Sequence, residues 1–187
     1  MEWQYRIGSD YLDKYLTNEG FDIVRLVDDD FLKAIKLLLN NHHYISGLKL
    51  IFSMIDSIAY LEFGDSRRNF IDWLDTYADL AGLEVTSDEL WECRNALLHM
   101  TGLESRKIRQ GNVRKLIPMV GGEIPEFLKS IEPGTGYLNI HQLYLLIVHS
   151  FPDWIQTYNE NPDKWVTFID RYDEISSESR LSFLEPL

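Results

Sequence analysis

Apolar residues recur at helical spacing along most of the chain. In residues 31–39 they are three and four positions apart, and the aspartates at 28–30 precede them. This pattern predicts a helix that begins at these acids, which would lie at the positive end of its dipole. A short helix over 9–17 is expected before it.

Residues 43–61 are apolar on most sides, which is typical of a central, buried helix. Their few polar residues form one stripe, in which Asp56 is the only charge between residues 50 and 61. Further helices are expected over 68–82 with a cap at Gly82, over 88–100 with Ser87 or Asp88 as its N-terminal cap, over 133–158 with a break near Pro152, and from Pro162 onward.

One segment departs from this helical pattern. Gly111-Asn112 is typical of a turn, and the apolar residues after it predict a short strand or a hairpin. We therefore expect a mainly all-α bundle with a small β-hairpin or strand insertion around 107–120. It would be a single domain, 1–187, with a core over about 28–160 on which the segment 1–27 and the helix 161–187 pack.

Composition narrows the class of protein. The net charge of −12 argues against non-specific binding to nucleic acid over the whole surface, although a local basic site remains compatible with it. No run of 18 apolar residues predicts a membrane span, and no basic stretch followed by an apolar one predicts a secretory signal. A single cysteine, Cys93, cannot form an internal disulfide, so a cytoplasmic setting is expected.

The helix over 88–100 carries the candidate chemistry. On a helical wheel Arg94 projects between Leu90 and Leu98, inside the apolar arc, whereas Asn95 and His99 share the narrow polar stripe. An unpaired buried guanidinium is costly, so Arg94 needs a carboxylate or an anionic ligand. Asp56 is the natural partner, with the aspartates at 72 and 75 as alternatives. Cys93 falls on the apolar arc and is expected in the core.

Several other chemistries lack their motifs. Histidines and carboxylates do not recur at metal-ligand spacing, and no His-Glu-x-x-His pattern occurs. The chain has neither a phosphate-binding glycine loop nor a Gly-x-Ser-x-Gly turn. We therefore expect no metal and no cofactor.

The segment Arg94-Asn95 with His99 resembles the motif of the HEPN superfamily (higher eukaryotes and prokaryotes nucleotide-binding domains). In that motif an arginine is followed by a polar residue and, four to six positions after the arginine, by a histidine. The wider sequence 48–64 with 89–116 is similar to a group of uncharacterised bacterial proteins of this kind, and the likeness covers about 28–120. It implies a HEPN-like helical bundle with a supporting acid, Asp56, on an earlier core helix.

The resemblance also implies an activity, which is metal-independent RNA cleavage in stress or in defence against phage. Arg94 would stabilise charge on a phosphate, His99 would move protons, and Asn95 would orient the phosphate or the imidazole. Arg94 and His99 are roughly 140° apart around the helix, so they are not expected to pair on one face. A homodimer with the two motif helices facing each other would gather them around one groove. An antitoxin or another protein partner would fit the same setting.

A basic segment follows the motif. Five lysines and arginines occur in residues 106–115 without an acidic residue: Arg106, Lys107, Arg109, Arg114 and Lys115. They could guide an RNA backbone toward the motif, or they could form a solvated hairpin that offsets nearby acids. No aromatic residue lies among them, so base stacking is not indicated there.

Three classes of function therefore stay open. They are a dimeric HEPN-type ribonuclease, a non-catalytic module that binds a nucleotide, an RNA or a protein, and a structural protein in which an Arg94–Asp56 pair fixes helix register. The exposure of Asn95 and His99 would distinguish these three classes. An open groove at Asn95 and His99 on a dimer axis would favour the first two, and a buried His99 bonded within one chain would favour the third.

Overall fold

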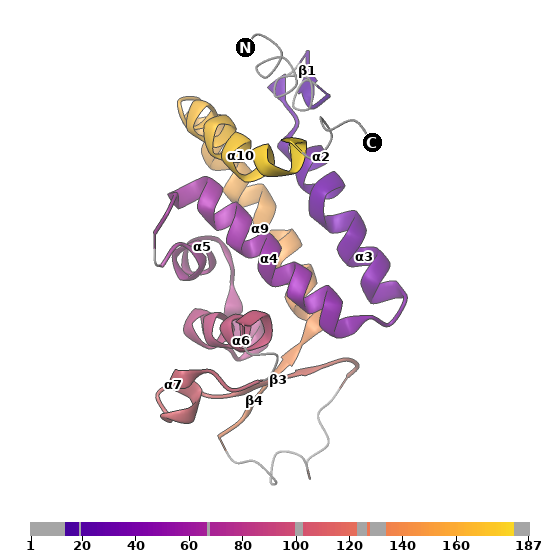
Figure 1. The fold of residues 1–187 in the computed structure, drawn as a ribbon, viewed down its shortest axis with the longest axis vertical. Helices are drawn as coiled ribbons and strands as arrows, with labels where there is room; N and C mark the ends of the chain where they lie inside the picture. The colour runs from indigo at the N-terminus through magenta and orange to yellow at the C-terminus, as the bar shows by residue number, and fades with distance from the viewer. Residues whose placement is uncertain are drawn as a thin grey trace.

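The computed structural model describes residues 14–18, 20–66, 68–99, 103–122, 127 and 134–181, with side chains as far as residue 175. Its elements follow one another along the chain as shown in Figure 1. In order they are β1 (Leu16–Thr17), β2 (Gly20–Phe21), α2 (Ile23–Val27), η1 (Asp28–Leu32), α3 (Lys33–Asn40), α4 (Tyr44–Phe63), α5 (Asn69–Tyr77), η2 (Leu80–Leu83), α6 (Ser87–His99), α7 (Arg106–Arg109), β3 (Leu116–Met119), β4 (Gly136–Asn139), α9 (Ile140–Glu160) and α10 (Lys164–Leu181). The prediction of a mainly all-α fold with a small β component is confirmed.

Helix α4 is the central element, as its apolar sequence predicted. It contacts α3, α5, α6, α9 and α10, so most of its sides are covered (Figure 1). It ends at Gly64, where the N–H donates to the carbonyl of Tyr60 and φ is +73°, a left-handed value that glycine adopts without strain. By length and hydropathy α4 could cross a membrane, but half of its most apolar window is buried inside the bundle, and core helices of soluble proteins share these properties.

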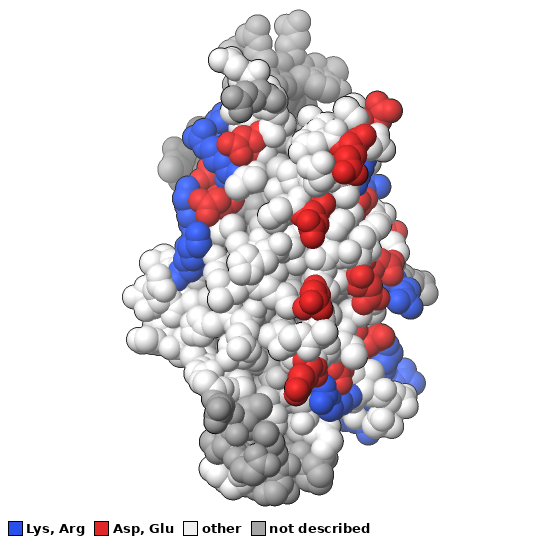
Figure 2. Space-filling model, turned by 180° about the vertical axis from the view of Figure 1, so that it is seen from behind, with Lys and Arg blue, Asp and Glu red and all other residues white. Residues whose placement is uncertain are grey.

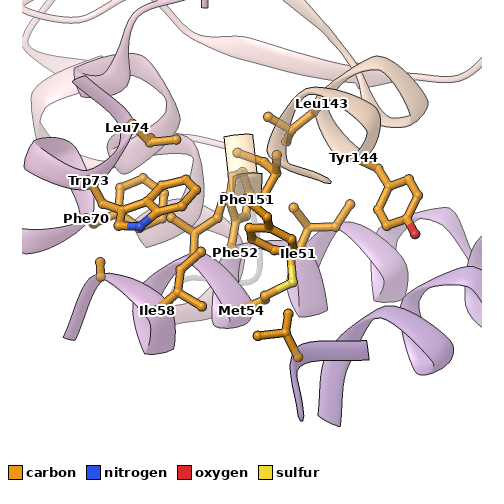
Figure 3. Close-up of a cluster of buried hydrophobic side chains, with 14 of the residues drawn as sticks. Ile51, Phe52, Met54, Ile58, Phe70, Trp73, Leu74, Leu143, Tyr144 and Phe151 are labelled. Atoms are coloured by element: carbon orange, nitrogen blue, oxygen red, sulfur yellow. The ribbon is translucent and has the colours of Figure 1, made fainter. Parts of the chain in front are cut away.

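The core forms where α4, α5 and α9 meet. Figure 3 shows Phe52 of α4, Phe70 and Trp73 of α5 and Phe151 of α9 among the buried side chains between these helices. The rings of Trp73 and Phe151 meet edge to face, with centroids 6.4 Å apart, an arrangement that adds to the free energy of burial. One buried cluster extends from Tyr15 near the N-terminus to Tyr172 in α10.

Charged groups are unevenly spread over the surface. In the view from behind in Figure 2, acidic residues are scattered over the right half, basic and acidic residues lie together at the upper left, and a broad area at the lower left carries neither sign of charge. Figure 1 shows α9 lying behind α4, so α9 is the helix that this rear view brings forward.

The N-terminal helical region begins earlier than predicted. Asp22 is the cap, because its side chain accepts a hydrogen bond from the backbone N–H of Arg25 at 3.0 Å. From there α2 runs through the π-helical turn η1 into α3. The prediction that the aspartates at 28–30 mark a helix start is wrong; within η1, Asp28 pairs with Lys33 and Lys36 instead.

Three further helix predictions differ from the structure. Leu16–Thr17 pair with Gly20–Phe21 as antiparallel strands, so the predicted helix over 9–17 is wrong at its end, and 9–13 lie outside the described residues. The third helix ends at Tyr77 rather than at Gly82, which lies in the 3₁₀ turn η2. Helix α9 continues through Pro152, which is exposed, so water can satisfy the backbone group that proline leaves unbonded.

The predicted strand after Gly111-Asn112 exists, but it does not form a hairpin. β3 pairs in parallel with β4, from Leu116 opposite Gly136 to Met119 opposite Asn139. Gly111 instead closes α7: its φ is +72°, and its N–H donates to the carbonyl of Ile108 at 2.9 Å. The turn residues therefore serve as a helix cap.

Candidate functional site

Helix α6, which carries the candidate motif, is fixed at its start by a reciprocal pair of hydrogen bonds. The backbone N–H of Glu89 donates to the Thr86 hydroxyl at 3.2 Å, and the N–H of Thr86 donates to the Glu89 carboxylate at 2.9 Å. This is a capping box. The cap is therefore Thr86 and neither of the two predicted residues, Ser87 and Asp88, which follow it directly.

Arg94 leaves the apolar face of α6 and reaches α4. Its Nε and Nη2 donate to the same carboxylate oxygen of Asp56, at 2.8 and 2.6 Å. The guanidinium carbon also lies 5.0 Å from the centroid of the half-buried Trp91 ring. The predicted partner is thus the right one. The two alternatives are engaged elsewhere, Asp72 with Arg68 and Asp75 with Ser87.

The third guanidinium nitrogen gathers the rest of the motif. Arg94 Nη1 donates to Asn95 Oδ1 at 2.9 Å and lies 2.9 Å from His99 Nε2. A guanidinium only donates, so His99 Nε2 must accept, and the imidazole proton then resides on Nδ1. All three motif residues therefore meet within one chain.

This contact overturns the expectation that Arg94 and His99 do not pair. A helical wheel gives the direction in which each side chain leaves the helix, but the long arginine side chain can bend back along the helix surface. The side chain of Arg94 is 17% exposed, whereas His99 is an exposed residue on the last turn of α6. The site is therefore open to solvent at His99 and only partly exposed at Arg94 and at Asp56, whose side chain is 25% exposed.

Partial burial of Asp56 is the largest influence on the pKa of its carboxyl group. Withdrawal from water raises the pKa of Asp56, and the hydrogen bonds and positive charge of Arg94 offset that effect only in part. A single guanidinium, shared with Asn95 and His99, compensates this carboxylate incompletely.

The basic segment divides into paired and unpaired residues. Lys107 pairs with Glu92 at 3.1 Å, Arg114 with Glu89 at 2.8 Å, and Lys115 with Glu104 at 3.6 Å. Glu89 and Glu92 are buried acids of α6, and their pairing with Arg114 and Lys107 was not predicted from the sequence. Lys107, Arg114 and Lys115 therefore offset nearby acids, which was one of the two roles expected for the basic segment.

Arg106 and Arg109 differ from the other three. Both are exposed on α7, and neither forms an ion pair with any residue that the structure describes. They are the members of the segment that keep their positive charge available to a ligand. Ser105 caps α7 through its hydroxyl, which accepts from the N–H of Ile108, so the two arginines stand on an ordered turn.

Metal-binding groups and the cysteine add nothing to the candidate site in the described part of the chain. In the described part of the chain, no three histidine, cysteine or acidic side chains come together in a way that could hold a metal ion. Cys93 is 1% exposed, as predicted for a core residue, and burial raises the pKa of its thiol to about 12. It is therefore not a nucleophile at neutral pH.

Comparisons with known proteins add no support to the HEPN resemblance. No family model matches the chain, and neither a curated relative nor a solved structure was found. The likeness to HEPN proteins thus stays a hypothesis carried by Arg94, Asn95 and His99.

Proposed function

We propose that this protein is a metal-independent endoribonuclease of HEPN type, with Arg94, Asn95 and His99 as its catalytic residues and Asp56 as the acid that positions Arg94. The observation that carries the proposal is the convergence on Arg94 Nη1 of Asn95 Oδ1 and His99 Nε2, each at 2.9 Å. A cation beside an exposed neutral imidazole is the pair that phosphodiester cleavage needs.

The reaction follows from these two groups. A phosphate oxygen competes with the imidazole as the acceptor for Arg94 Nη1, and its arrival frees the lone pair of His99 Nε2. His99 then takes the proton of the ribose 2′-hydroxyl, whose oxygen attacks phosphorus. The P–O5′ bond breaks, the leaving oxygen takes a proton from a water molecule that in turn takes the proton held by His99, and a 2′,3′-cyclic phosphate remains. Arg94 stabilises the charge that develops on the non-bridging oxygens.

In this proposal Arg106 and Arg109 attract the RNA backbone toward the site. Their charges form no ion pair with the described part of the chain and follow the motif in sequence, whereas the net charge of −12 otherwise repels a polyanion. Because the three motif residues meet in one chain, the proposed cleavage does not require a second chain to complete the site. A homodimer, cytoplasmic action in stress or phage defence, and an antitoxin or other protein partner are what the resemblance implies.

The alternative is a structural role, and a specific observation favours it. Arg94 already donates to three side chains within its own chain, as a helix-register pair would. A non-catalytic module that binds a nucleotide, an RNA or a protein would use the same residues without turnover.

The test is cleavage of a mixed-sequence RNA by the full chain in excess chelator. We expect products ending in 2′,3′-cyclic phosphate, no cleavage of a 2′-deoxy substrate, and loss of at least about 100-fold in rate for His99→Ala. His43→Ala is the matched control, since His43 is exposed on the loop before α4. Equal cleavage by His99→Ala, or none by the folded wild-type chain, would refute the ribonuclease and favour the binding or structural role.

A further inference from the structure

The central helix α4 reaches the surface along a narrow stripe of mostly polar residues. Between positions 48 and 59, the residues that are not buried are Lys49, Leu50, Ser53, Asp56 and Ser57. Lys49, Ser53 and Asp56 are separated by four and three positions, so they follow one another along one line of the helix surface. Because Asp56 anchors Arg94, this stripe leads from the candidate motif to Lys49.

Lys49 is a cation without a partner in the part of the chain that the structure describes. Lys33 and Lys36 of α3 both pair with Asp28, but Lys49 forms no ion pair or hydrogen bond with a described residue. It is seven residues from Asp56, about 10 Å along the helix, and residues 31–55 contain no acid. Lys49 is also half-buried, so its charge is partly withdrawn from water and uncompensated, which favours the binding of an anion.

The other end of the same stripe carries acids. Tyr60, one helical turn after Asp56, donates a hydrogen bond to Glu174 of α10. This bond, together with the negative charges of Glu174 and Asp65, raises the pKa of the Tyr60 hydroxyl, and the positive charge of Arg171 offsets the effect only in part. A polyanion that reaches the motif is therefore repelled on the Tyr60 side and attracted on the Lys49 side.

Helix α6, which carries the motif, lies between α7 and α4 (Figure 1). An ion pair of Glu92 joins it to α7, and the ion pair of Arg94 joins it to α4. Arg106 and Arg109 stand on α7 without ion pairs to described residues, and Lys49 stands on α4 in the same condition. An RNA strand that crosses α6 at the motif can therefore meet a cation that is not neutralised on either side.

We propose that Lys49 binds a second backbone phosphate of the RNA, within about three nucleotides of the phosphate that is cleaved. Phosphates follow one another at about 3.4 Å or more along a strand, so the distance of about 10 Å along α4 from Asp56 to Lys49 corresponds to two or three of them. The proposal rests on the proposed ribonuclease for the identity of the first phosphate. Lys49 takes no part in the chemical step, and it makes the site favour longer strands over dinucleotides.

The first test is binding, measured by fluorescence anisotropy of a labelled 2′-fluoro RNA of about eight nucleotides, which lacks the 2′-hydroxyl and cannot be cleaved. Lys49→Met keeps the apolar stem of the side chain and removes its charge. We expect this variant to raise Kd about tenfold and to lower the slope of log affinity against log salt by about 0.7. Lys49→Arg should keep the wild-type affinity.

Lys33→Ala is the matched control for the loss of one positive charge. Lys33 pairs with Asp28 and Asp29, so this change should alter Kd by less than about twofold. The proposal is overturned by a Lys49→Met variant that binds the oligonucleotide as tightly as the wild type does. A wild-type chain that does not bind the oligonucleotide would overturn it as well.

The second test is cleavage, which separates Lys49 from the motif. A dinucleotide has a single bridging phosphate and cannot reach Lys49. Lys49→Met should therefore lower kcat/KM about tenfold for a longer RNA and less than about twofold for the dinucleotide. An equal loss on both substrates would show that Lys49 acts through the motif residues, against the proposal. Binding that depends on Lys49 in a chain that cleaves neither substrate would refute the ribonuclease and support the phosphate site.

Discussion

Removal of the Glu62 carboxylate should destabilise the protein more than removal of any exposed acid. Glu62 stands near the end of α4 with a side chain only 7% exposed. It accepts hydrogen bonds from Trp154 Nε1 at 3.0 Å, Tyr158 Oη at 2.9 Å and Tyr77 Oη at 3.1 Å, and it pairs with Lys164 Nζ at 2.5 Å. One carboxylate thus connects α4, α5, α9 and α10.

The magnitude follows from what Glu62→Ala leaves behind. Trp154 is 0% exposed and Tyr158 1% exposed, so both lose a partner that water cannot easily replace, at about 1 kcal/mol or more each. Lys164 keeps a side chain that is 24% exposed and can turn toward water, so its stranded charge adds about 1 to 2 kcal/mol, below the cost of breaking a fully buried pair. We expect a loss of about 3 to 4 kcal/mol in the free energy of unfolding.

Urea denaturation followed by circular dichroism measures this loss, since tryptophan fluorescence would report Trp154 itself. Glu160→Ala is the control: Glu160 is exposed on α9, its one hydrogen bond with a described side chain comes from Gln156, and the change should alter stability by less than about 0.5 kcal/mol. If Glu62→Ala falls within about 0.5 kcal/mol of Glu160→Ala, the carboxylate does not hold the four helices together.

The remaining predictions concern pH, the site, the basic segment and packing. Burial opposes ionisation of Glu62, but its hydrogen bonds from Lys164, Tyr158 and Trp154 outweigh burial and lower its pKa. The stabilisation from the ionised carboxylate is therefore present above the unfolded pKa near 4.5 and is lost as pH falls through the lower folded pKa. The difference in unfolding free energy between wild type and Glu62→Gln should shrink over that pH range. Asp56→Ala should cost about 2 to 3 kcal/mol in thermal unfolding by stranding the Arg94 guanidinium, and a loss under about 0.5 kcal/mol would show that the pair is not stabilising. Arg106→Ala with Arg109→Ala should lower the slope of log affinity for RNA against log salt by about 1.4, roughly 0.7 for each charge on a single strand, and an unchanged slope would remove them from the RNA site. Gly136→Ala should cost about 1 to 3 kcal/mol in urea denaturation, because its Cβ would lie 2.6 Å from Leu116 Cδ2, and a neutral effect would mean that Leu116 shifts freely.

The sequence allowed the fold class and the central pair of the site to be predicted, for a physical reason. Arg94 is a charge within the apolar arc of its helix, and Asp56 is the only charge between residues 50 and 61 of a mostly apolar helix. Two such charges in one bundle are expected to pair, because an unpaired charge withdrawn from water is costly. That constraint is strong enough to identify partners 38 residues apart in sequence. The central position of α4 followed in the same way from its apolar sides.

Other contacts depended on details that periodicity does not contain. The Arg94–His99 bond needs the bent path of one long side chain. The four donors to Glu62 come from three helices, and one of them, Lys164, is 102 residues away. The parallel pairing of β3 with β4 joins two strands of four residues each, too short for pattern or turn chemistry to specify a partner.

The two acids of α4 show how the same helix can carry a structural group and a reactive one. Glu62 has four donors, and its pKa is lowered; Asp56 has one guanidinium, and burial raises its pKa. A carboxylate satisfied by four partners holds helices in place and has no bond to spare. Arg94, by contrast, binds Asp56 through Nε and Nη2 and reserves Nη1 for Asn95 and His99. In the proposed reaction a phosphate would therefore take Nη1 without breaking the pair that anchors the arginine, and the proposed site would bind and release an anion while the fold stays intact.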